Sequence, residues 1–456
     1  MFHPEHDRDT ICALATAQGV SALAIIRVSG ENADFVMRAI APDLTKDLCD
    51  HRAYYTFLRN PFDGEVIDEV MVTYFAKGRS YTREPSFEIS CHGNPHIVGQ
   101  ILHVLVRSGA RLAERGEFTY RAVMSGRIDL VQAESVLDLI ESQSPRAAKM
   151  ALRSLRGELS NQLLAVEDDL VWALAQLEAN IDFSSEDIIF TPYDNILNRL
   201  ADVETELKRL VQSFHFGRII KEGLNVVFVG PPNVGKSSLF NKLAGEERSI
   251  VSERPGTTRD WVDFEKQVYG QLIRFVDCAG VRITDDEVED LGINRALKAI
   301  ESADVAIRVI DVKTTEADEM AMVDLAIQNA KVSTVITVGN KCDLLAPGEE
   351  PKVSVDLLVS AAKDMGLDKL LEKILEKTDL SILDDGALIH NTRQFEALSS
   401  AVKFLEAGKM AVERNRSPEF VAADLQSCLQ EIMKLRGAQL NNEVTDRVFH
   451  DFCIGK

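Results

Sequence analysis

The sequence predicts a multidomain α/β protein with an N-terminal α+β domain, an all-α helical domain, and an α/β domain inserted into the helical one. Three observations predict this fold class. Short β-like runs mix with helical stretches near the start, long amphipathic helical patterns follow, and similar patterns return after about residue 391. Between the two helical blocks, strands and helices alternate. Such an insertion is plausible because the ends of a domain usually lie close together.

The predicted boundaries follow these changes in pattern. They are 1–124 for the N-terminal domain, 125–218 and 381–456 for the two parts of the helical domain, and 219–380 for the inserted domain. A chain of 456 residues with 45% hydrophobic content fits two to four domains with real cores.

Charge and cysteine usage restrict the function classes. Proteins that bind nucleic acid through its phosphates are usually basic, whereas this chain has a net charge of −21. Binding to a nucleic acid would therefore require a local basic patch or a second protein. The seven cysteines are scattered and never form a C-x-x-C pair, which predicts reduced thiols, a cytoplasmic location and no zinc site. No apolar run of about 18 residues predicts a membrane span, and the start lacks a leader pattern.

The N-terminal domain is predicted from its alternating runs. "ALAIIRVSG", "EVMVTYFA" and "SFEISCHG" predict strands, and "PHIVGQILHVLVRSGA" predicts a helix.

The helical domain begins with a strong start signal. Ser144 and Pro145 place proline at a first helical position, and apolar residues then recur at spacings of three and four from Met150 to Leu177. This pattern predicts one long amphipathic helix to about Asn180. "NILNRLADVETELKRLVQSF" predicts a second helix to about Phe214, and "TRQFEALSSAVKFLEAGKMAVERN" and "PEFVAADLQSCLQEIMKL" predict the returning helices.

The inserted domain opens with "NVVFVGPPNVGKSSLFNKLAG", a predicted strand, the pattern G-x-x-x-x-G-K-S, and a predicted helix. In such a P-loop, backbone N–H groups cradle phosphates, Lys236 reaches the β/γ oxygens, and Ser237 binds Mg²⁺. The predicted contacts here are Gly230, Asn233, Val234, Gly235, Lys236, Ser237 and Ser238.

Three later motifs predict that the nucleotide is GTP. "IRFVDCAG" places Asp277 at a strand end, where it can hold Mg²⁺ through water, and the Gly280 amide can meet the γ-phosphate. "VITVGNKCD" ends a strand in N-K-x-D, formed by Asn340, Lys341 and Asp343. Asp343 can accept two hydrogen bonds from guanine that adenine cannot offer. "LLVSAAK" adds Ser360 and Ala361, whose amide is expected to meet guanine O6.

Two features of this site are unusual. Val281 stands where a Ras-like enzyme has the glutamine that orients the attacking water, so hydrolysis must recruit another group. The acidic residues nearby are candidates, although a solvated acidic face also fits them: Asp285, Asp286, Glu287, Glu289 and Asp290. Asn233 could ligate a monovalent cation, or could be there for turn geometry. "RPGTTRD" predicts the first switch, with Thr258 as the second Mg²⁺ hydroxyl.

The stretch "FCIGK" places Cys453 where a prenylated GTPase carries its lipid. Ile454, Gly455 and Lys456 do not fit a prenylation box and no polybasic run precedes them, which argues against a lipid anchor. "VTDRVFHDF" predicts a helix that docks through its apolar residues (Val448, Phe449 and Phe452) and leaves "CIGK" as a flexible, projecting arm. Cys453 is then either a nucleophile or acid/base group, or a packing residue.

Taken together, the P-loop, "PGTTRD", "DCAG", the helical wrapping and "FCIGK" resemble the MnmE (TrmE) family of tRNA-modifying GTPases over essentially the whole chain. The resemblance implies a homodimer formed through the N-terminal domains, which bind a 5-formyltetrahydrofolate-type one-carbon donor. It also implies a flavin-dependent MnmG (GidA)-type partner, with which the protein builds a carboxymethylaminomethyl group at C5 of the wobble uridine of certain tRNAs. That partner would then provide many of the contacts with tRNA.

The resemblance also implies roles for single residues. A potassium ion would be held by Asn233, Ser252, Arg254 and Thr257, and would supply the positive charge that an arginine finger gives elsewhere. Ser252, Thr257 and Thr258 would also contact GTP, and dimerisation of two inserted domains would order this switch. Glu289 matches the catalytic glutamate. The folate contacts match Arg27, Glu88 and Arg127, with Lys456 nearby.

Some positions depart from the family pattern. "TAQGVSAL" keeps only Gly19 of a Pro/Gly-rich loop, Arg127 replaces the commoner lysine, and Asn94 replaces a glycine in a turn that asparagine can form at positive φ. The alternative function is a ribosome-assembly GTPase acting as an RNA-binding switch, because its P-loop and switch motifs are similar. Such proteins usually add a basic RNA-binding domain, which this acidic chain lacks.

Overall fold

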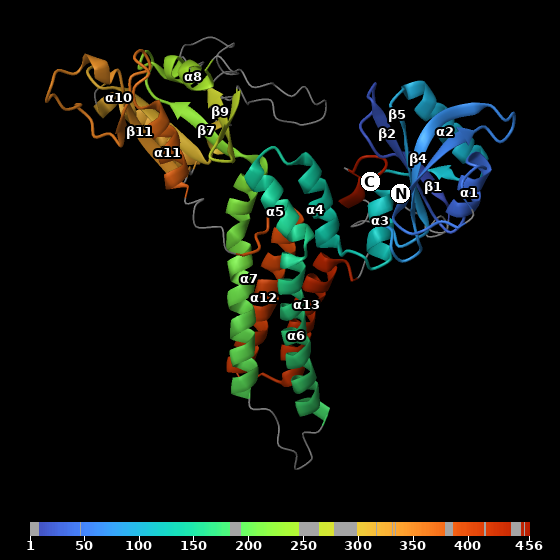
Figure 1. Cartoon of the computed structure of the whole chain (residues 1–456). Coiled ribbons are helices and arrows are strands. Elements are labelled where there is room, and N and C mark those ends of the chain that lie inside the picture. The colour runs from blue at the N-terminus through green and yellow to red at the C-terminus, as the bar shows by residue number, and fades with distance from the viewer. Residues whose placement is uncertain are drawn as a thin grey trace, which may run out of the picture. The chain divides into compact units, whose positions relative to one another are not determined.

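The computed structural model describes residues 9–45, 47–182, 193–245, 264–277, 299–315, 317–330, 332, 334–378, 386–414, 416–438, 448–450 and 452–456. The chain divides into two compact units, and we describe each by itself (Figure 1). The first comprises 1–137, 154–204 and 400–456, and the second comprises 138–153 and 205–399. Along the described residues, no helix combines the length and the apolar character needed to cross a bilayer.

The first unit contains a six-stranded sheet in the order β3-β4-β5-β2-β1-β6. Neighbouring strands are antiparallel except β1 and β6. The strands are β1 Ile11–Leu14, β2 Leu23–Ser29, β3 Arg52–Arg59, β4 Val66–Phe75, β5 Ser86–His92 and β6 Arg111–Leu112. The helices α1 Ala33–Ile40 and α2 Pro95–Arg107 pack against this sheet, and α3 Glu117–Met124 follows β6. The predicted strands and helix are confirmed.

Asn94 differs from its prediction. It has φ −96° and its side chain accepts a hydrogen bond from the His96 amide, so it caps α2 and does not form a positive-φ turn. Asparagine is among the favoured N-cap residues because its side-chain oxygen satisfies a free helical N–H.

The long helix predicted from Pro145 to Asn180 is wrong in one respect. The structure has two helices there, α5 Pro145–Leu155 and α6 Glu158–Asp182. Gly157 lies between them at φ +90°, a left-handed conformation that ends a helix. Beyond this break, α6 lies side by side with α13 Pro418–Arg436 in the first unit (Figure 1). The other helices of the predicted helical domain are α4 Leu130–Glu141, α7 Tyr193–Glu222 and α12 Thr392–Glu413. The second predicted helix corresponds to α7 and extends beyond Phe214.

The second unit contains a six-stranded sheet in the order β12-β11-β10-β7-β9-β8. All neighbours are parallel except the β8–β9 pair. The strands are β7 Leu224–Val229, β8 Phe264–Val268, β9 Gln271–Asp277, β10 Val305–Asp311, β11 Thr334–Asn340 and β12 Leu357–Leu358. The helices with full bounds are α8 Lys236–Ala244, α10 Ala317–Ala330 and α11 Leu367–Lys377.

Both faces of this parallel sheet are buried. Val226 and Phe228 of β7 belong to one apolar cluster, and the alternate residues Val227 and Val229 belong to another. Helices that cover both faces of a parallel sheet define a doubly wound α/β domain. The predicted fold class is therefore confirmed: two sheets of different topology, together with a set of long helices.

The core of the second unit extends beyond the sheet. Ala147 and Met150 of α5, Ile219 and Ile220 of α7, and Leu388 belong to the same apolar cluster as the strands. Strand β8 also contacts the segment before α5, where Gln267 Nε2 donates to the Gln143 carbonyl at 2.6 Å.

Candidate active site

The loop between β7 and α8 has a backbone that requires glycine at two positions. Gly230 has φ +152°, and a Cβ there would lie 2.2 Å from the Val309 carbonyl oxygen. Gly235 has φ +94°, and a Cβ there would lie 2.3 Å from Asn340 Nδ2. Between them, Asn233 adopts φ +64°, an uncommon conformation that asparagine tolerates better than most residues. The two motif glycines are therefore fixed by their surroundings.

Lys236 and Ser237 begin helix α8 directly after this loop. Lys236 Nζ donates to the carbonyls of Gly230 and Pro231, both at 2.8 Å, so its ammonium group lies over the loop. Ser237 and Ser238 are exposed on the first turn of α8. The N-terminus of a helix after a glycine-rich loop is a favourable site for phosphate, because free backbone N–H groups point outward there.

The N-K-x-D motif at the end of β11 is tied to the same loop. Asn340 is buried, and its Nδ2 donates to the Val234 carbonyl at 2.9 Å. Lys341, at φ +63°, donates from Nζ to the Asn233 carbonyl at 3.0 Å and to Asp311 Oδ2 at 2.7 Å. The structure thus brings together the predicted phosphate-binding and base-binding residues.

Asp343 and Ser360, both predicted to contact GTP, lie next to each other, since Ser360 Oγ donates to Asp343 Oδ1 at 2.5 Å. The Ala361 amide donates to Asn340 Oδ1 at 3.2 Å. To bind guanine O6 as expected, this N–H must either donate to both oxygens or leave Asn340. Ser238 and Ala361 line one cavity of about 710 Å³, between α8 and the segment that follows Ser360.

The remaining predicted residues of this site lie at the edge of the residues that the structure describes, or outside them. Asp277 is the last residue of β9, as its motif predicts. The other predicted residues fall outside the described residues: Ser252, Arg254, Thr257, Thr258, Gly280 and Glu289.

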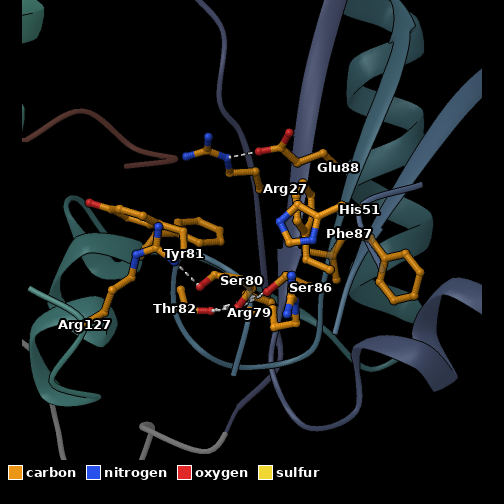
Figure 2. A pocket seen from close by; sticks show the side chains of 14 residues that line it. Arg27, His51, Arg79, Ser80, Tyr81, Thr82, Ser86, Phe87, Glu88 and Arg127 are labelled. Atoms are coloured by element: carbon orange, nitrogen blue, oxygen red, sulfur yellow. Dashed lines mark hydrogen bonds and ion pairs between the residues drawn. The ribbon is translucent and has the colours of Figure 1, made fainter. Parts of the chain in front are cut away.

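The first unit contains a separate pocket of about 180 Å³ (Figure 2). Strands β2 and β5 pair so that Arg27 lies directly opposite Glu88. The Arg27 Nε donates to Glu88 Oε1 at 2.8 Å, and both side chains are only partly exposed. A guanidinium and a carboxylate therefore meet at this wall of the pocket.

Arg127 and Tyr81 form another wall. Arg127 donates from Nη1 to the Ser80 carbonyl at 2.6 Å, and its guanidinium lies 5.4 Å from the centre of the Tyr81 ring (Figure 2). The Tyr81 hydroxyl is 3.1 Å from Thr119 Oγ1. Burial raises the pKa of Tyr81, while Thr119, Arg27 and Arg127 act to lower it. Sequence reasoning missed Tyr81, although an aromatic residue between cations in "RSYTRE" is a signal for a ring-binding wall.

The segment 452–456 reaches this pocket and is not a projecting arm, so that prediction is wrong. Ile454 pairs with Arg115, the Gly116 amide donates to the Cys453 carbonyl at 3.4 Å, and the Phe118 amide donates to the Lys456 carbonyl at 3.2 Å. Gly455 permits this docking because it has φ +94°, and a Cβ there would lie 2.3 Å from the Leu14 carbonyl oxygen.

The docked segment lies against Arg27, which is one of the residues that line the pocket. Arg27 Nη1 lies 3.4 Å from the Gly455 carbonyl, to which it donates. The pKa of Lys456 is lowered by burial and by the charge of Arg27, while Glu88 and Cys453 act to raise it. The structure therefore gathers Arg27, Glu88 and Lys456, with Arg127 across the pocket. The Cys453 side chain is exposed.

The preceding residues anchor the segment. Val448, Phe449 and Phe452 are buried as predicted, in a cluster with Tyr120, Leu130 and Ala133. Phe449 meets Tyr120 edge to face, with ring centres 5.8 Å apart.

A P-loop, an N-K-x-D motif tied to it and a doubly wound sheet define a P-loop GTPase. Known protein families support this assignment. Residues 130–453 match the model of the MnmE helical domain, and residues 10–127 match that of the GTP-binding protein TrmE N-terminus. The chain belongs to the MnmE family of tRNA modification GTPases.

Individual relatives match at full length. The tRNA modification GTPase MnmE of Bdellovibrio bacteriovorus is 40% identical, over 100% of this chain and 99% of that protein. The protein of the same name from Flavobacterium psychrophilum is 36% identical, over 98% and 99%. Among solved structures, a variant of Aquifex aeolicus Era bound to GDP and AlF₄⁻ is 28% identical over 39% of this chain and 65% of that chain, with a TM-score of 0.28.

Proposed function

We propose that this GTPase couples GTP hydrolysis to formation of a carboxymethylaminomethyl group at C5 of the wobble uridine of certain tRNAs. In this proposal it acts as a cytoplasmic homodimer with an MnmG (GidA)-type flavoprotein and a 5-formyltetrahydrofolate-type donor. The observation that carries the proposal is the N-terminal pocket, where Arg27 and Glu88 meet the docked segment that ends in Lys456. Full-length relatives named for tRNA modification support it. The six described cysteines are all free, which agrees with a reducing compartment.

The pocket residues suit a folate ring. The Glu88 carboxylate can accept hydrogen bonds from the amino and ring N–H groups of a pterin, while Arg27 and Arg127 supply donors and positive charge. Tyr81 offers an aromatic face within the same pocket. Cys453 is exposed rather than buried, which favours a chemical role over a packing role.

At the nucleotide site we propose potassium activation. Among the described residues the side-chain amide of Asn233 makes no hydrogen bond, while its carbonyl is held by Lys341. The backbone is thus fixed and the amide oxygen is available to a cation. The proposed ligands of potassium are Asn233, Ser252, Arg254 and Thr257, and those of Mg²⁺ are Ser237 and Thr258. Glu289 is proposed to orient or activate the attacking water, and the predicted domain boundaries are kept as part of the proposal.

Mass spectrometry of wobble uridines from cells that lack this gene tests the proposal. We expect the modified nucleoside to disappear, and to return when the wild-type gene is supplied. Cys453→Ser should fail to restore it while leaving GTP hydrolysis and thermal stability unchanged, because the thiol is exposed. Unchanged wobble uridines in the cells without the gene would contradict the proposal. The ribosome-assembly alternative predicts ribosome defects with normal tRNA.

A further inference from the structure

The N-terminal pocket is too small for a whole folate. Its volume is about 180 Å³, whereas sites that bury drug-sized ligands usually measure roughly 300–1,000 Å³. A bicyclic ring fits such a space, and the remainder of the molecule must lie outside it. This step rests on the proposed folate function of the pocket.

A histidine and an arginine lie on the pocket wall without a role in the arrangement above. His51 and Arg79 both line the pocket (Figure 2). Both also bind Asp50. His51 Nδ1 lies 2.8 Å from Asp50 Oδ2, and Arg79 contacts the same oxygen through Nε. Asp50 is itself fixed, because its Oδ1 accepts a hydrogen bond from the Ala76 amide at 2.8 Å.

Both side chains are held in place while their outer groups face solvent. The side chains of His51 and Arg79 are 51% and 69% exposed, against 22% for Asp50. Within the described part of the chain, the outer amino groups of Arg79 and the Nε2 of His51 make no hydrogen bond. His51 also packs edge to face on Phe75, with ring centres 5.1 Å apart.

The backbone of His51 is strained. Its φ is +56°, a region that costs a non-glycine residue on the order of 1–3 kcal/mol and persists only where surrounding contacts enforce it. Here the His51 amide donates to the Tyr74 carbonyl at 2.8 Å. This conformation places the ring beside Arg79 at the pocket.

We propose that His51 and Arg79, oriented by Asp50, bind the carboxylates of the γ-linked glutamate tail of the folate. Each added glutamate brings one more carboxylate, and an arginine fork suits carboxylates in particular. The pair lies on the wall of the ring pocket, so a tail that leaves the pocket on this side meets it. RNA phosphate is the other anion to consider, but a histidine and an arginine that adjoin a ring pocket favour an anion covalently joined to the ring.

Titration calorimetry on the full chain with three probes tests this proposal. The probes are 5-formyltetrahydropterin, which has no tail, and 5-formyltetrahydrofolate with one and with five glutamates. We expect the pentaglutamate to bind wild type about fivefold more tightly than the tailless pterin, since one exposed ion pair contributes up to about 1 kcal/mol. Arg79→Gln and His51→Gln should each remove most of this advantage and leave binding of the tailless pterin unchanged.

Lys77→Gln is the matched control, because Lys77 is a cation of the same loop that pairs with Glu31 and does not line the pocket. Equal binding of tailed and tailless forms by wild type, or a tail advantage that survives Arg79→Gln and His51→Gln, would overturn the inference. So would a loss of tRNA binding in these variants with the tail advantage intact. Failure of all three probes to bind wild type would instead refute the proposed folate function.

Discussion

Asp138 shows how one buried charge joins parts of the second unit that are distant in sequence. Its carboxylate contacts Lys221 Nζ and His390 Nε2, both at 2.6 Å, from the ends of the segments that flank the inserted sheet. Burial acts to raise the pKa of Asp138, but His390 and Lys221 outweigh it and lower the pKa to about 2.

This arrangement predicts pH-dependent stability. The folded pKa of Asp138 is about 2 and an unfolded aspartate titrates near 3.9, so its contribution is complete above about pH 4 and is lost as the pH falls towards 2. We expect Asp138→Asn to lower the free energy of unfolding by about 2–3 kcal/mol at pH 7. Urea denaturation followed by circular dichroism should show the gap to wild type narrowing between pH 4 and pH 2.

Asp364→Asn is the matched control, because Asp364 is exposed in the same unit and pairs with Lys242. It should change stability little at any pH. A gap between Asp138→Asn and wild type that stayed constant with pH would show that packing, not charge, causes the effect.

Asn233 allows a second test at this scale. We expect Asn233→Ala to bind GTP almost normally and to lose the faster hydrolysis in potassium than in sodium. The reason is that its carbonyl, not its side chain, makes the bond to Lys341. Hydrolysis rates in the two salts at equal ionic strength measure this difference. If the variant kept the potassium advantage, Asn233 would be a turn residue only.

At the scale of elements, strands β10 and β11 meet the P-loop through their carboxyl ends. Asp311 ends β10 and is almost fully buried, while Lys341 follows β11 and bridges Asp311 to Asn233. Burial acts to raise the pKa of Asp311, but Lys341 and the neighbouring donors lower it overall. We therefore expect Asp311 to be a positioning residue for Lys341, the lysine of the predicted base-binding motif.

We expect Asp311→Asn to weaken binding of GDP by about tenfold, since a hydrogen bond to a charged group contributes about 1.5–3 kcal/mol. Calorimetry with GDP measures the loss. Asp324→Asn is a suitable control, because Asp324 pairs with Arg308 of the same strand away from the P-loop. GDP affinity equal to wild type in the Asp311 variant would exclude the positioning role.

Local patterns predicted most elements but not their interruptions or distant partners. The glycine-rich loop and N-K-x-D carry their geometry in a few adjacent residues, so β7, α8 and β11 could be predicted from the sequence. The apolar spacing from Met150 to Leu177 continues through the helix break, because periodicity reports a buried face and not the φ of Gly157. Asp311 and Tyr81 act through residues far away in sequence, and no spacing rule shows such contacts.

At the scale of the whole molecule, the segment 452–456 contacts Arg27, which lines a pocket built from residues 27–127. A segment of five residues has too little pattern for its docking to be predicted, and the contacts that hold it involve Leu14, Arg115, Gly116 and Phe118.

Gly455→Ala tests whether this docking matters. The added Cβ would lie 2.3 Å from the Leu14 carbonyl oxygen at a φ that alanine disfavours, so the segment should leave its place and remove Lys456 from Arg27 and Glu88. We expect folate affinity by calorimetry to fall about tenfold, with GTP hydrolysis unchanged. Ile454→Ala, an exposed position of the same segment, should keep both. Undiminished affinity in Gly455→Ala would show that the segment is dispensable for the pocket.

The docking of Gly455 against Leu14 also sets an order of events during synthesis. A ribosome makes residue 14 first and residue 455 more than four hundred residues later. The first sheet can fold early, but Arg27 of its pocket lacks the contact with Gly455 until the rest of the chain has emerged. If the pocket binds a one-carbon donor as proposed, a nascent or truncated chain would hold that donor poorly, and loading would be confined to chains that already possess their GTPase domain.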